Sequence, residues 1–138
     1  MIGGCGFVGS NLCEALATKG HAVYSYDNYF TGSRKNHIDN VVYKFGETID
    51  IGSAEFGVRF SHIYHFGEYS RVEQSFDDLD LVFRFNHFPL IEVLKFAKAN
   101  DAKLIYSGSS TKFADGGENA SASPYAWTKK TNTGLIQA

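Results

Sequence analysis

Hydrophobic side chains recur one helical turn apart near the beginning of the chain. Val8, Leu12 and Leu16 share one helical face. Gly20 follows at the position where a glycine commonly ends a helix. This pattern predicts a helix over residues 7–19.

Four short segments carry the β-branched and aromatic residues that are typical of strands. They cover residues 21–27, 41–45, 62–66 and 103–107. A second helical pattern runs from about residue 79 to 98, and Pro89 predicts a kink there or a division into two shorter helices. Strands and helices alternate, which predicts an α/β fold with a doubly wound, Rossmann-like parallel sheet. Ligands of such a sheet bind beyond the carboxyl ends of the strands.

Composition narrows the class of protein. A chain of 138 residues with 43% hydrophobic and 20% charged residues is expected to form one globular domain, residues 1–138. The net charge of -2, without a basic stripe, predicts no nucleic-acid partner. No apolar run reaches the roughly 18 residues of a membrane span, so we expect a cytoplasmic protein without a membrane partner. The five histidines and two cysteines show no metal-ligand spacing, so no metal is expected.

A glycine run opens the first predicted helix. Gly3, Gly6 and Gly9 lie where unpaired backbone N–H groups and the positive end of the helix dipole suit a phosphate, and a pyrophosphate in particular. Asp27 ends the next predicted strand, where a carboxylate can accept hydrogen bonds from an adenosine ribose and repel a 2′-phosphate. This arrangement favours NAD over NADP. The alternative for Asp27 is a turn residue ahead of Asn28.

Only two residues precede Gly3, whereas a strand of about five residues normally leads into such a glycine turn. We therefore expect the first strand to be largely missing. That strand is central in the usual order, so a gap is predicted between its two neighbours. On this interpretation the chain is a fragment.

Near the end of the chain, Tyr125 and Lys129 are four residues apart and would share one helical face. Ser123 and Pro124 fit the N-cap and the first position of that helix. An ammonium close to a phenol favours the phenolate, so the pair could supply a base near neutral pH.

Five segments in order resemble one family, the extended short-chain dehydrogenase/reductase group of NAD-dependent sugar-nucleotide epimerases and dehydratases. GGCGFVGSNL is similar to its GGxGFIGSxL, YDNYFTGSRKN to DNxxxGxxxN, and HIYHFGEYSRVEQSF to HLAAxxxVxxS. YSGSSTKFAD is similar to the SSxxVYG strand end, and SPYAWTKK to PYxxSK. The resemblance covers nearly the whole chain. A second domain, which holds the substrate in this family, is expected to be absent.

The resemblance implies an enzyme that oxidises a nucleotide-sugar to a keto intermediate, alters it and reduces it again, as an isomerase or a lyase. The implied catalytic residues are Tyr125 as the base, Lys129 beside it and Ser109 as a hydrogen-bond partner of the reacting hydroxyl. NAD is the implied cofactor, and a homodimer is expected by analogy. The implied cofactor contacts are Gly3, Gly6, Phe7, Val8, Gly9, Asp27, Asn28, Asp50, Ile51, Phe66, Gly67 and Lys129.

Some positions depart from the family pattern or leave alternatives open. Gly67 and Glu68 replace the two alanines of HLAA, and a carboxylate there is unfavourable near phosphates unless it is paired, for which Arg71 is the candidate. The acidic residue that contacts adenine could be Glu47 or Asp50. Asn86 could be an active-site residue, a helix-kink residue or a solvent-facing one.

Two other classes of function remain open. A dinucleotide-binding module without catalysis agrees with the missing first strand and substrate domain. An S-adenosylmethionine-dependent methyltransferase also uses a glycine turn and an acidic residue, but it has no need of Tyr125, Lys129 or Ser109.

Overall fold

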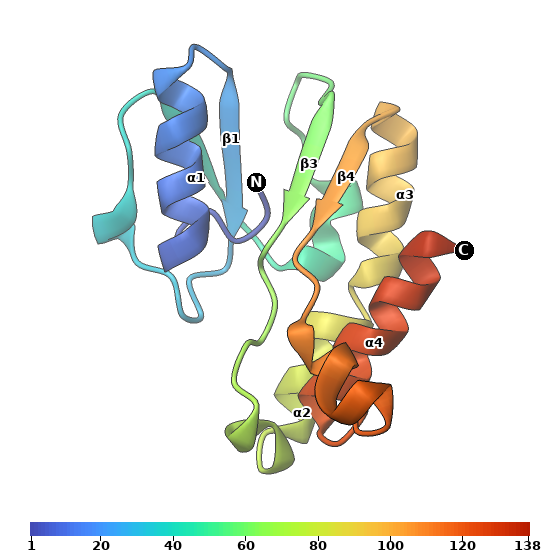
Figure 1. The fold of residues 1–138 in the computed structure, drawn as a ribbon. Coiled ribbons are helices and arrows are strands. Elements are labelled where there is room, and N and C mark those ends of the chain that lie inside the picture. Colours follow the sequence, from blue (N-terminus) through green and yellow to red (C-terminus); the bar gives the residue numbers. More distant parts are fainter.

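The computed structural model describes residues 1–138, with the side chains of all of them except those of residues 112, 114 and 115. The strands are β1 (Val23–Asp27), β2 (Val41–Phe45), β3 (His62–His65) and β4 (Lys103–Tyr106), and the helices are α1 (Phe7–Thr18), α2 (Leu79–Val82), α3 (Leu90–Asn100) and α4 (Pro124–Gln137). A π-helical turn spans Phe83–His87, and 3-10 turns span Arg34–Asn36, Thr48–Ser53, Glu73–Phe76 and Ser110–Gly117. Figure 1 shows these elements, coloured from blue at the N-terminus to red at the C-terminus. All four predicted strands and both helical patterns are confirmed.

The strands form two parallel pairs that the start of the chain joins. β1 pairs with β2 from Val23↔Val41 onward, and β3 pairs with β4 from His62↔Lys103 onward. Ile2 lies between the pairs and bridges both neighbours, β1 at Tyr26 and β3 at His65. The strand order is therefore β2-β1-Ile2-β3-β4, with a single residue in the place of a central strand.

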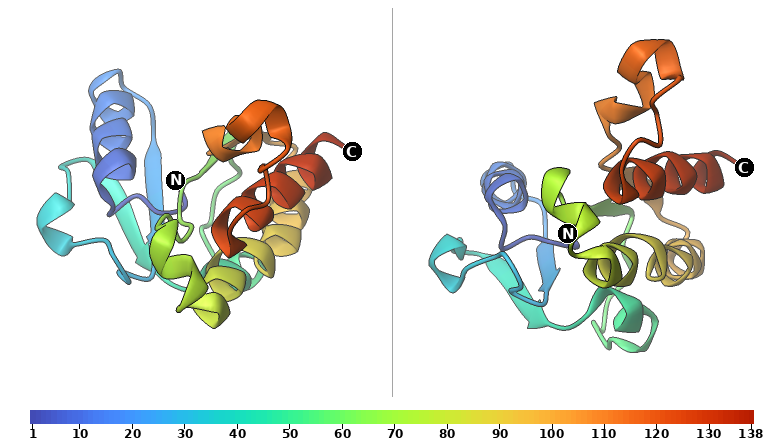
Figure 2. Two further views of the ribbon diagram at one scale, coloured as in Figure 1. Left: turned by 60° about the horizontal axis from the view of Figure 1, so that its bottom comes forward. Right: turned by 90° about the horizontal axis from the view of Figure 1, so that it is seen from below.

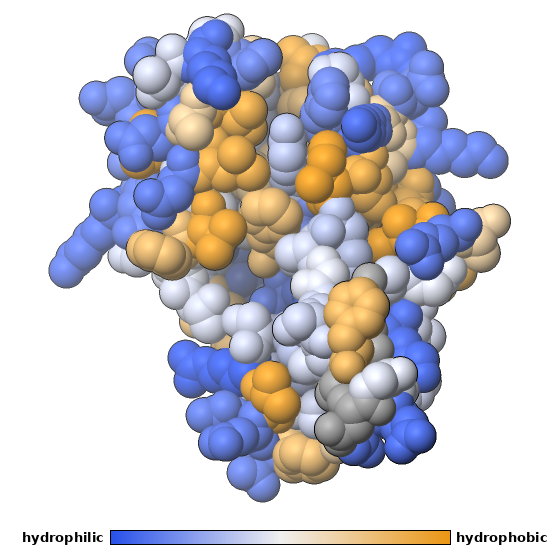
Figure 3. Space-filling model, in the orientation of Figure 1, coloured by the Kyte–Doolittle hydropathy of each residue, from blue (hydrophilic) through white to orange (hydrophobic). Residues whose placement is uncertain are grey.

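The predicted gap is closed at one end and open at the other. Beside the glycine turn, the N–H of Ile2 donates to the carbonyl of Tyr64 at 2.8 Å, and the N–H of Phe66 donates to Ile2 at 2.9 Å. Toward the beginning of β1 and β3, a cavity of about 530 Å³ separates the strands, and Met1, Tyr24 and His62 are among its lining residues. On the face seen in Figure 3, hydrophobic residues, in orange, gather in the upper half, where β1 and β3 begin.

Helices cover both faces of the sheet (Figure 2). On one face, Ile2, Tyr26 and Ile63 pack against α3 and the 3-10 turn Thr48–Ser53 in a buried cluster. Successive strand residues point to opposite faces, so Ser25 points to the other face, where α1 packs. The core therefore fixes the positions of the carboxyl ends of β1 and β3.

Local sequence signals explain the helix boundaries. The Oγ of Ser123 accepts a hydrogen bond from the N–H of Ala126 at 3.0 Å, and Pro124 is the first residue of α4, as predicted. Pro89 precedes α3, and the π-helical turn separates α3 from α2, so the predicted division into two helices is confirmed. Among the described residues, none of the helices has the length and apolar character needed to cross a bilayer.

Candidate functional site

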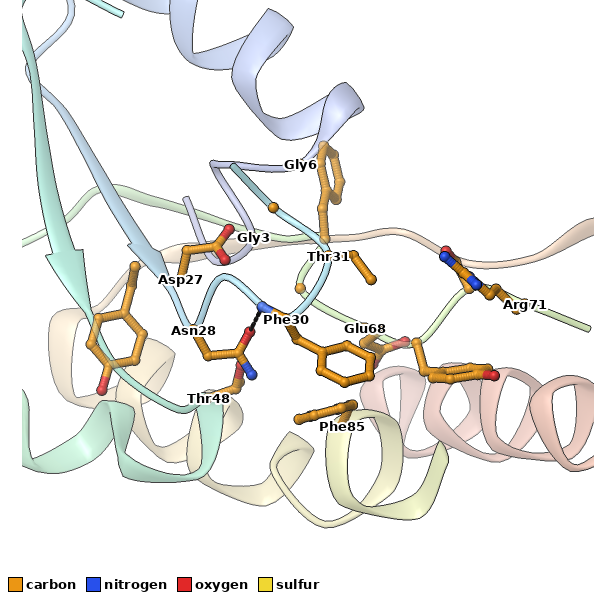
Figure 4. A pocket seen from close by; sticks show the side chains of 16 residues that line it. Gly3, Gly6, Asp27, Asn28, Phe30, Thr31, Thr48, Glu68, Arg71 and Phe85 are labelled. Carbon is orange, nitrogen blue, oxygen red and sulfur yellow. Dashed lines mark hydrogen bonds between the residues drawn. The ribbon is translucent and has the colours of Figure 1, made fainter. Parts of the chain in front are cut away.

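A pocket lies beyond the carboxyl ends of β1 and β3, at the mouth of α1 (Figure 4). Its walls come from the glycine turn, from the segment after β1, from the segment after β3 and from the π-helical turn. Six residues predicted as cofactor contacts line it, namely Gly3, Gly6, Asp27, Asn28, Phe66 and Gly67. The fold thus brings together residues that are far apart in the sequence.

The three glycines of the turn are required for different structural reasons. Gly3 has a φ of +83°, and a Cβ there would lie 2.5 Å from the backbone nitrogen of Gly67. A Cβ on Gly9 would lie 2.0 Å from the carbonyl oxygen of Gly3, so the turn packs directly on the first turn of α1. Gly6 has an ordinary extended backbone, and a Cβ there would meet its nearest atom at 3.7 Å. Gly3 and Gly9 are therefore needed for the fold, whereas Gly6 leaves space on the pocket side.

The mouth of α1 suits an anion. Gly6 is the N-cap and offers no side chain, and no acidic residue lies in the first turn. Phe7 and Val8, the first two residues of α1, are 83% and 62% exposed. Gly6 lines the pocket, whereas Phe7, Val8 and Gly9 do not. The first turn of a helix has unpaired N–H groups and the positive end of the helix dipole, so a phosphate would be stabilised beside Gly6.

Asp27 is fixed at the end of β1 and is 7% exposed. Its Oδ2 accepts a hydrogen bond from the N–H of Cys5, and its Oδ1 accepts one from the N–H of Tyr29, each at 2.8 Å. Tyr29 has a φ of +57°, so the carboxylate also stabilises a tight turn. Each carboxylate oxygen has a further lone pair available for a ligand. The turn role and the ribose role proposed for Asp27 are thus compatible.

Asn28 connects the pocket to Glu47, one of the two acidic residues that are candidates for contacting adenine. Its Oδ1 accepts a hydrogen bond from the N–H of Phe30 at 3.0 Å, drawn as the dashed line in Figure 4. Its Nδ2 donates to Glu47 at 3.3 Å. Glu47 also pairs with Arg84 at 3.2 Å on the molecular surface.

Asp50 and Ile51 occupy the 3-10 turn Thr48–Ser53 and do not line the pocket. Ile51 is 1% exposed and belongs to the core cluster, and Asp50 is exposed. Thr48, from the same turn, reaches the pocket instead. Contacts of Asp50 and Ile51 with a cofactor remain predictions.

The three predicted catalytic residues come from the end of β4 and from α4. Lys129 is 4% exposed, and its Nζ lies 5.9 Å from the ring centre of Tyr125. The ammonium also donates to the carbonyl of Ser107 at 2.8 Å, which ties α4 to the end of β4. Two residues further on, the Oγ of Ser109 accepts a hydrogen bond from the Oγ1 of Thr111 at 2.9 Å. The predicted shared face of Tyr125 and Lys129 is confirmed, while their catalytic roles remain predictions.

Glu68 joins this pair to the pocket. It lines the pocket, its side chain is 1% exposed, and its Oε2 lies 2.5 Å from the Nζ of Lys129. The Nε2 of His65 lies 3.3 Å from the Oε1. The expected pairing with Arg71 is wrong, because Lys129 and His65 are buried beside Glu68 while Arg71 is exposed.

The ionisation of this cluster follows from its contacts. Burial acts to raise the pKa of Glu68, but the imidazole of His65 and the ammonium of Lys129 outweigh it, so the pKa lies below its usual value. Tyr106 donates to the Oε2 of Glu68 at 3.0 Å. Burial and the charge of Glu68 raise the pKa of Tyr106, so Tyr106 stays a neutral donor. We therefore describe Glu68 as an ionised, buried carboxylate.

Asn86 is completely buried in the π-helical turn, so its solvent-facing interpretation is wrong. Its Oδ1 accepts a hydrogen bond from the N–H of Tyr69 at 2.6 Å, and its Nδ2 donates to the carbonyl of Tyr69 at 3.1 Å. Asn86 thereby fixes the segment that follows Glu68.

Sequence reasoning missed several lining residues of the pocket. The rings of Phe30 and Phe85 lie 4.7 Å apart at its edge, and Tyr69 lines it as well. The aromatic residues of this chain are numerous and carry no distinguishing spacing, so the sequence held no signal for these three. Within the part of the chain that the structure describes, no three His, Cys, Asp or Glu residues are grouped so that they could hold a metal ion.

Comparisons with known proteins agree with this geometry. UDP-glucose 4-epimerase from Brucella ovis, solved in complex with NAD, superposes with a TM-score of 0.88 at 22% identity, over 99% of this chain and 45% of that one. UDP-glucose 4-epimerase from Thermus thermophilus, also solved with NAD, gives a TM-score of 0.80 at 25% identity, over 99% and 48%. These likenesses confirm the expected Rossmann-like fold.

Among curated proteins, UDP-glucuronic acid decarboxylase 1 of Danio rerio is 28% identical over 116 residues, which are 83% of this chain and 28% of that protein. The chain therefore spans less than a third of that relative and about half of the solved structures. The model of the NAD dependent epimerase/dehydratase family, whose description names NAD as the cofactor, matches residues 1–138. From its fold, its pocket and this match over its full length, the chain belongs to the NAD-dependent epimerase/dehydratase family.

Proposed function

We propose that this chain binds NAD and belongs to an enzyme that converts a nucleotide-sugar through a transient keto intermediate. The observation that carries the proposal is one pocket lined both by the glycine turn with Asp27 and by Glu68, which is bonded to Lys129. The named relatives, an epimerase and a decarboxylase of UDP-sugars, support a nucleotide-sugar as the substrate class.

The residues present fit NAD. The open mouth of α1 beside Gly6 would hold the pyrophosphate, and Asp27 would accept hydrogen bonds from the adenosine ribose. The partners of Asp27 are backbone N–H groups without net charge, so the carboxylate keeps its negative charge toward the pocket. A 2′-phosphate would be repelled there, which favours NAD over NADP.

In the chemistry that we propose, Tyr125 takes the proton of the sugar hydroxyl while Ser109 holds that hydroxyl by a hydrogen bond. Lys129 presents its ammonium to Tyr125 and to the nicotinamide ribose. NAD, when bound, supplies the acceptor and later the donor of a hydride, so the net redox change is zero. Epimerisation, dehydration and decarboxylation all share this first oxidation.

Calorimetric titration of NAD tests the binding half of the proposal. Gly6→Val is the informative variant, because a side chain at Gly6 fits the backbone but fills the space beside the mouth of α1. Gly134→Ala, on an open surface of α4, is the matched control. Saturable binding in the wild type and the control, lost in Gly6→Val, supports the proposal. Equal binding by Gly6→Val, or a preference for S-adenosylmethionine over NAD, contradicts it.

Product analysis by NMR tests the catalytic half. The chain is incubated with NAD and, in separate samples, UDP-glucose or UDP-glucuronic acid. Turnover that disappears in Tyr125→Phe while NAD binding persists supports the assigned base. Turnover that survives in Tyr125→Phe assigns the proton transfer to another group.

One observation favours a second candidate, a dinucleotide-binding module without catalysis. The ammonium of Lys129 is already held by Glu68 in a buried ion pair, at a position where the family pattern has alanine. NAD binding by both proteins, with turnover in Glu68→Ala but none in the wild type, would favour this second function, because only loss of the ion pair frees the ammonium of Lys129.

A further inference from the structure

We propose that Glu68 is a positioning residue that fixes the ammonium of Lys129 and offsets its charge at Tyr125. The inference rests on the role of Tyr125 and Lys129 in the proposed function. It adds a residue to their pair that the HLAA pattern of the family does not contain.

The contacts of Lys129 define the first part of this role. A lysine ammonium has three N–H donors. One donates to the carbonyl of Ser107 at 2.8 Å, and the Nζ forms an ion pair with the Oε2 of Glu68 at 2.5 Å. The Nζ also lies 5.0 Å from the ring centre of Tyr106 and 5.9 Å from that of Tyr125, so Glu68 limits the number of bonds that Lys129 can offer to a ligand.

Glu68 can fix the ammonium because hydrogen bonds to both of its carboxylate oxygens fix Glu68 itself. Tyr106 donates to its Oε2 at 3.0 Å, and the Nδ2 of Asn132 lies 3.3 Å from its Oε1. Asn132 is completely buried and also donates to the carbonyl of Asn86 at 2.8 Å. Side chains of β4 and α4 thus bind the carboxylate, Asn132 links it to the π-helical turn, and these bonds fix it beside Lys129.

The charges around the pair define the second part of the role. From β3, His65 faces Glu68 with its Nε2 at 3.3 Å, and neither of its ring nitrogens has a hydrogen-bond partner of good geometry among the described residues. From the π-helical turn, the Nδ1 of His87 lies 3.0 Å from the Oδ1 of Asn132. From the segment after β3, Arg71 lines the same pocket but is exposed to solvent.

Among the described residues, Glu68 is the carboxylate that pairs with Lys129. At low local dielectric, a carboxylate 2.5 Å from an ammonium cancels most of the field that the ammonium exerts on a ring 5.9 Å away. With Glu68 ionised, Tyr125 gains less help from Lys129 in losing its proton. Loss of the carboxylate should let the phenolate form at lower pH.

A difference titration measures this effect without any substrate. Absorbance at 295 nm reports phenolate, and subtracting the curve of Tyr125→Phe isolates Tyr125 among the 8 tyrosines. The same subtraction in a Glu68→Gln background should give a midpoint about one pH unit lower, which is about a tenfold change in the ionisation constant. An unchanged or higher midpoint would overturn the proposal.

Controls separate charge from structure. Tyr106→Phe removes a neutral hydrogen bond to Glu68 but leaves the carboxylate charged, so its midpoint for Tyr125 should stay at the wild-type value. Circular dichroism at each pH identifies any variant that unfolds. Glu68→Ala, which restores the residue of the family pattern, replaces Glu68→Gln if the latter does not fold. NAD titration of Gly6→Val is independent of this result, so failure of the inference and failure of the proposed function are distinguishable.

Discussion

Replacing Gly9 by alanine should destabilise the chain, although alanine is the better helix former. The Cβ would lie 2.0 Å from the carbonyl oxygen of Gly3 and 2.9 Å from the Cα of Gly4, and all of these neighbours are backbone atoms. An ordinary contact needs more than 3 Å, so the turn would have to move by about 1 Å.

The glycine turn has little freedom to make that movement. The N–H of Gly3 donates to the carbonyl of Tyr26 at 2.9 Å, and Gly3 also packs on the backbone of Gly67. Overpacking of this kind costs about 1–3 kcal/mol, and more where backbone must shift. Alanine returns about 1 kcal/mol in helix propensity. Because backbone must shift here, the cost lies at the upper end of that range, and we expect a net loss of about 1–2 kcal/mol in the free energy of unfolding.

Gly134 provides the matched control, because it is also a helical glycine but has no atom within 4 Å of its Cβ position. Gly134→Ala should therefore stabilise the chain by about 0.5–1 kcal/mol. Urea denaturation followed by circular dichroism measures both variants. A Gly9→Ala variant as stable as the wild type, or shifted in the same direction as Gly134→Ala, would refute the packing argument.

Three further predictions follow from single contacts. Asn86→Leu should cost about 2–4 kcal/mol in urea denaturation, because both backbone groups of Tyr69 lose their buried partner. The pKa of Glu68 is lowered by folding, so its carboxylate stabilises the fold above about pH 4.5, and this stability is lost as the pH falls through the folded-state pKa. Between pH 7 and pH 3, the melting temperature of Glu68→Gln should therefore fall less than that of the wild type. Asp27→Asn should weaken NAD binding about tenfold and narrow the preference over NADP, as measured by calorimetry, and an unchanged preference would contradict the role of Asp27.

Local patterns predicted the elements of the fold well, because each depends on neighbours in sequence. The strand Val41–Phe45 and the N-cap at Ser123 are read from a few consecutive residues, and the structure confirms both. The shared face of Tyr125 and Lys129 depends only on helical spacing. Pro89 predicted a break between helices, but the π-helical turn before it also needs Asn86 to be drawn into the interior by Tyr69 and Thr128.

The side-chain network of the candidate site could not be predicted in the same way. Glu68 and Lys129 lie on separate elements, and their contact exists only because the end of β3 faces α4. In the sequence, Arg71 lies three residues from Glu68 and Lys129 lies far from it, so distance along the chain favours Arg71 as the partner of Glu68. Burial decided otherwise, since a carboxylate that is 1% exposed gains most from cations that are buried with it.

The two carboxylates that line the pocket differ in what surrounds them, and this difference assigns them different tasks. Asp27 is bound by two backbone N–H groups, which fix it without neutralising it. Glu68 is bound by the ammonium of Lys129, which cancels its charge within the pocket wall. The pocket wall is therefore negative where β1 ends, whereas after β3 the paired Glu68 adds little net charge and Arg71 adds a positive one. A ligand with a 2′-phosphate would meet repulsion only where β1 ends, so selectivity between NAD and NADP should depend on Asp27 and be insensitive to Glu68.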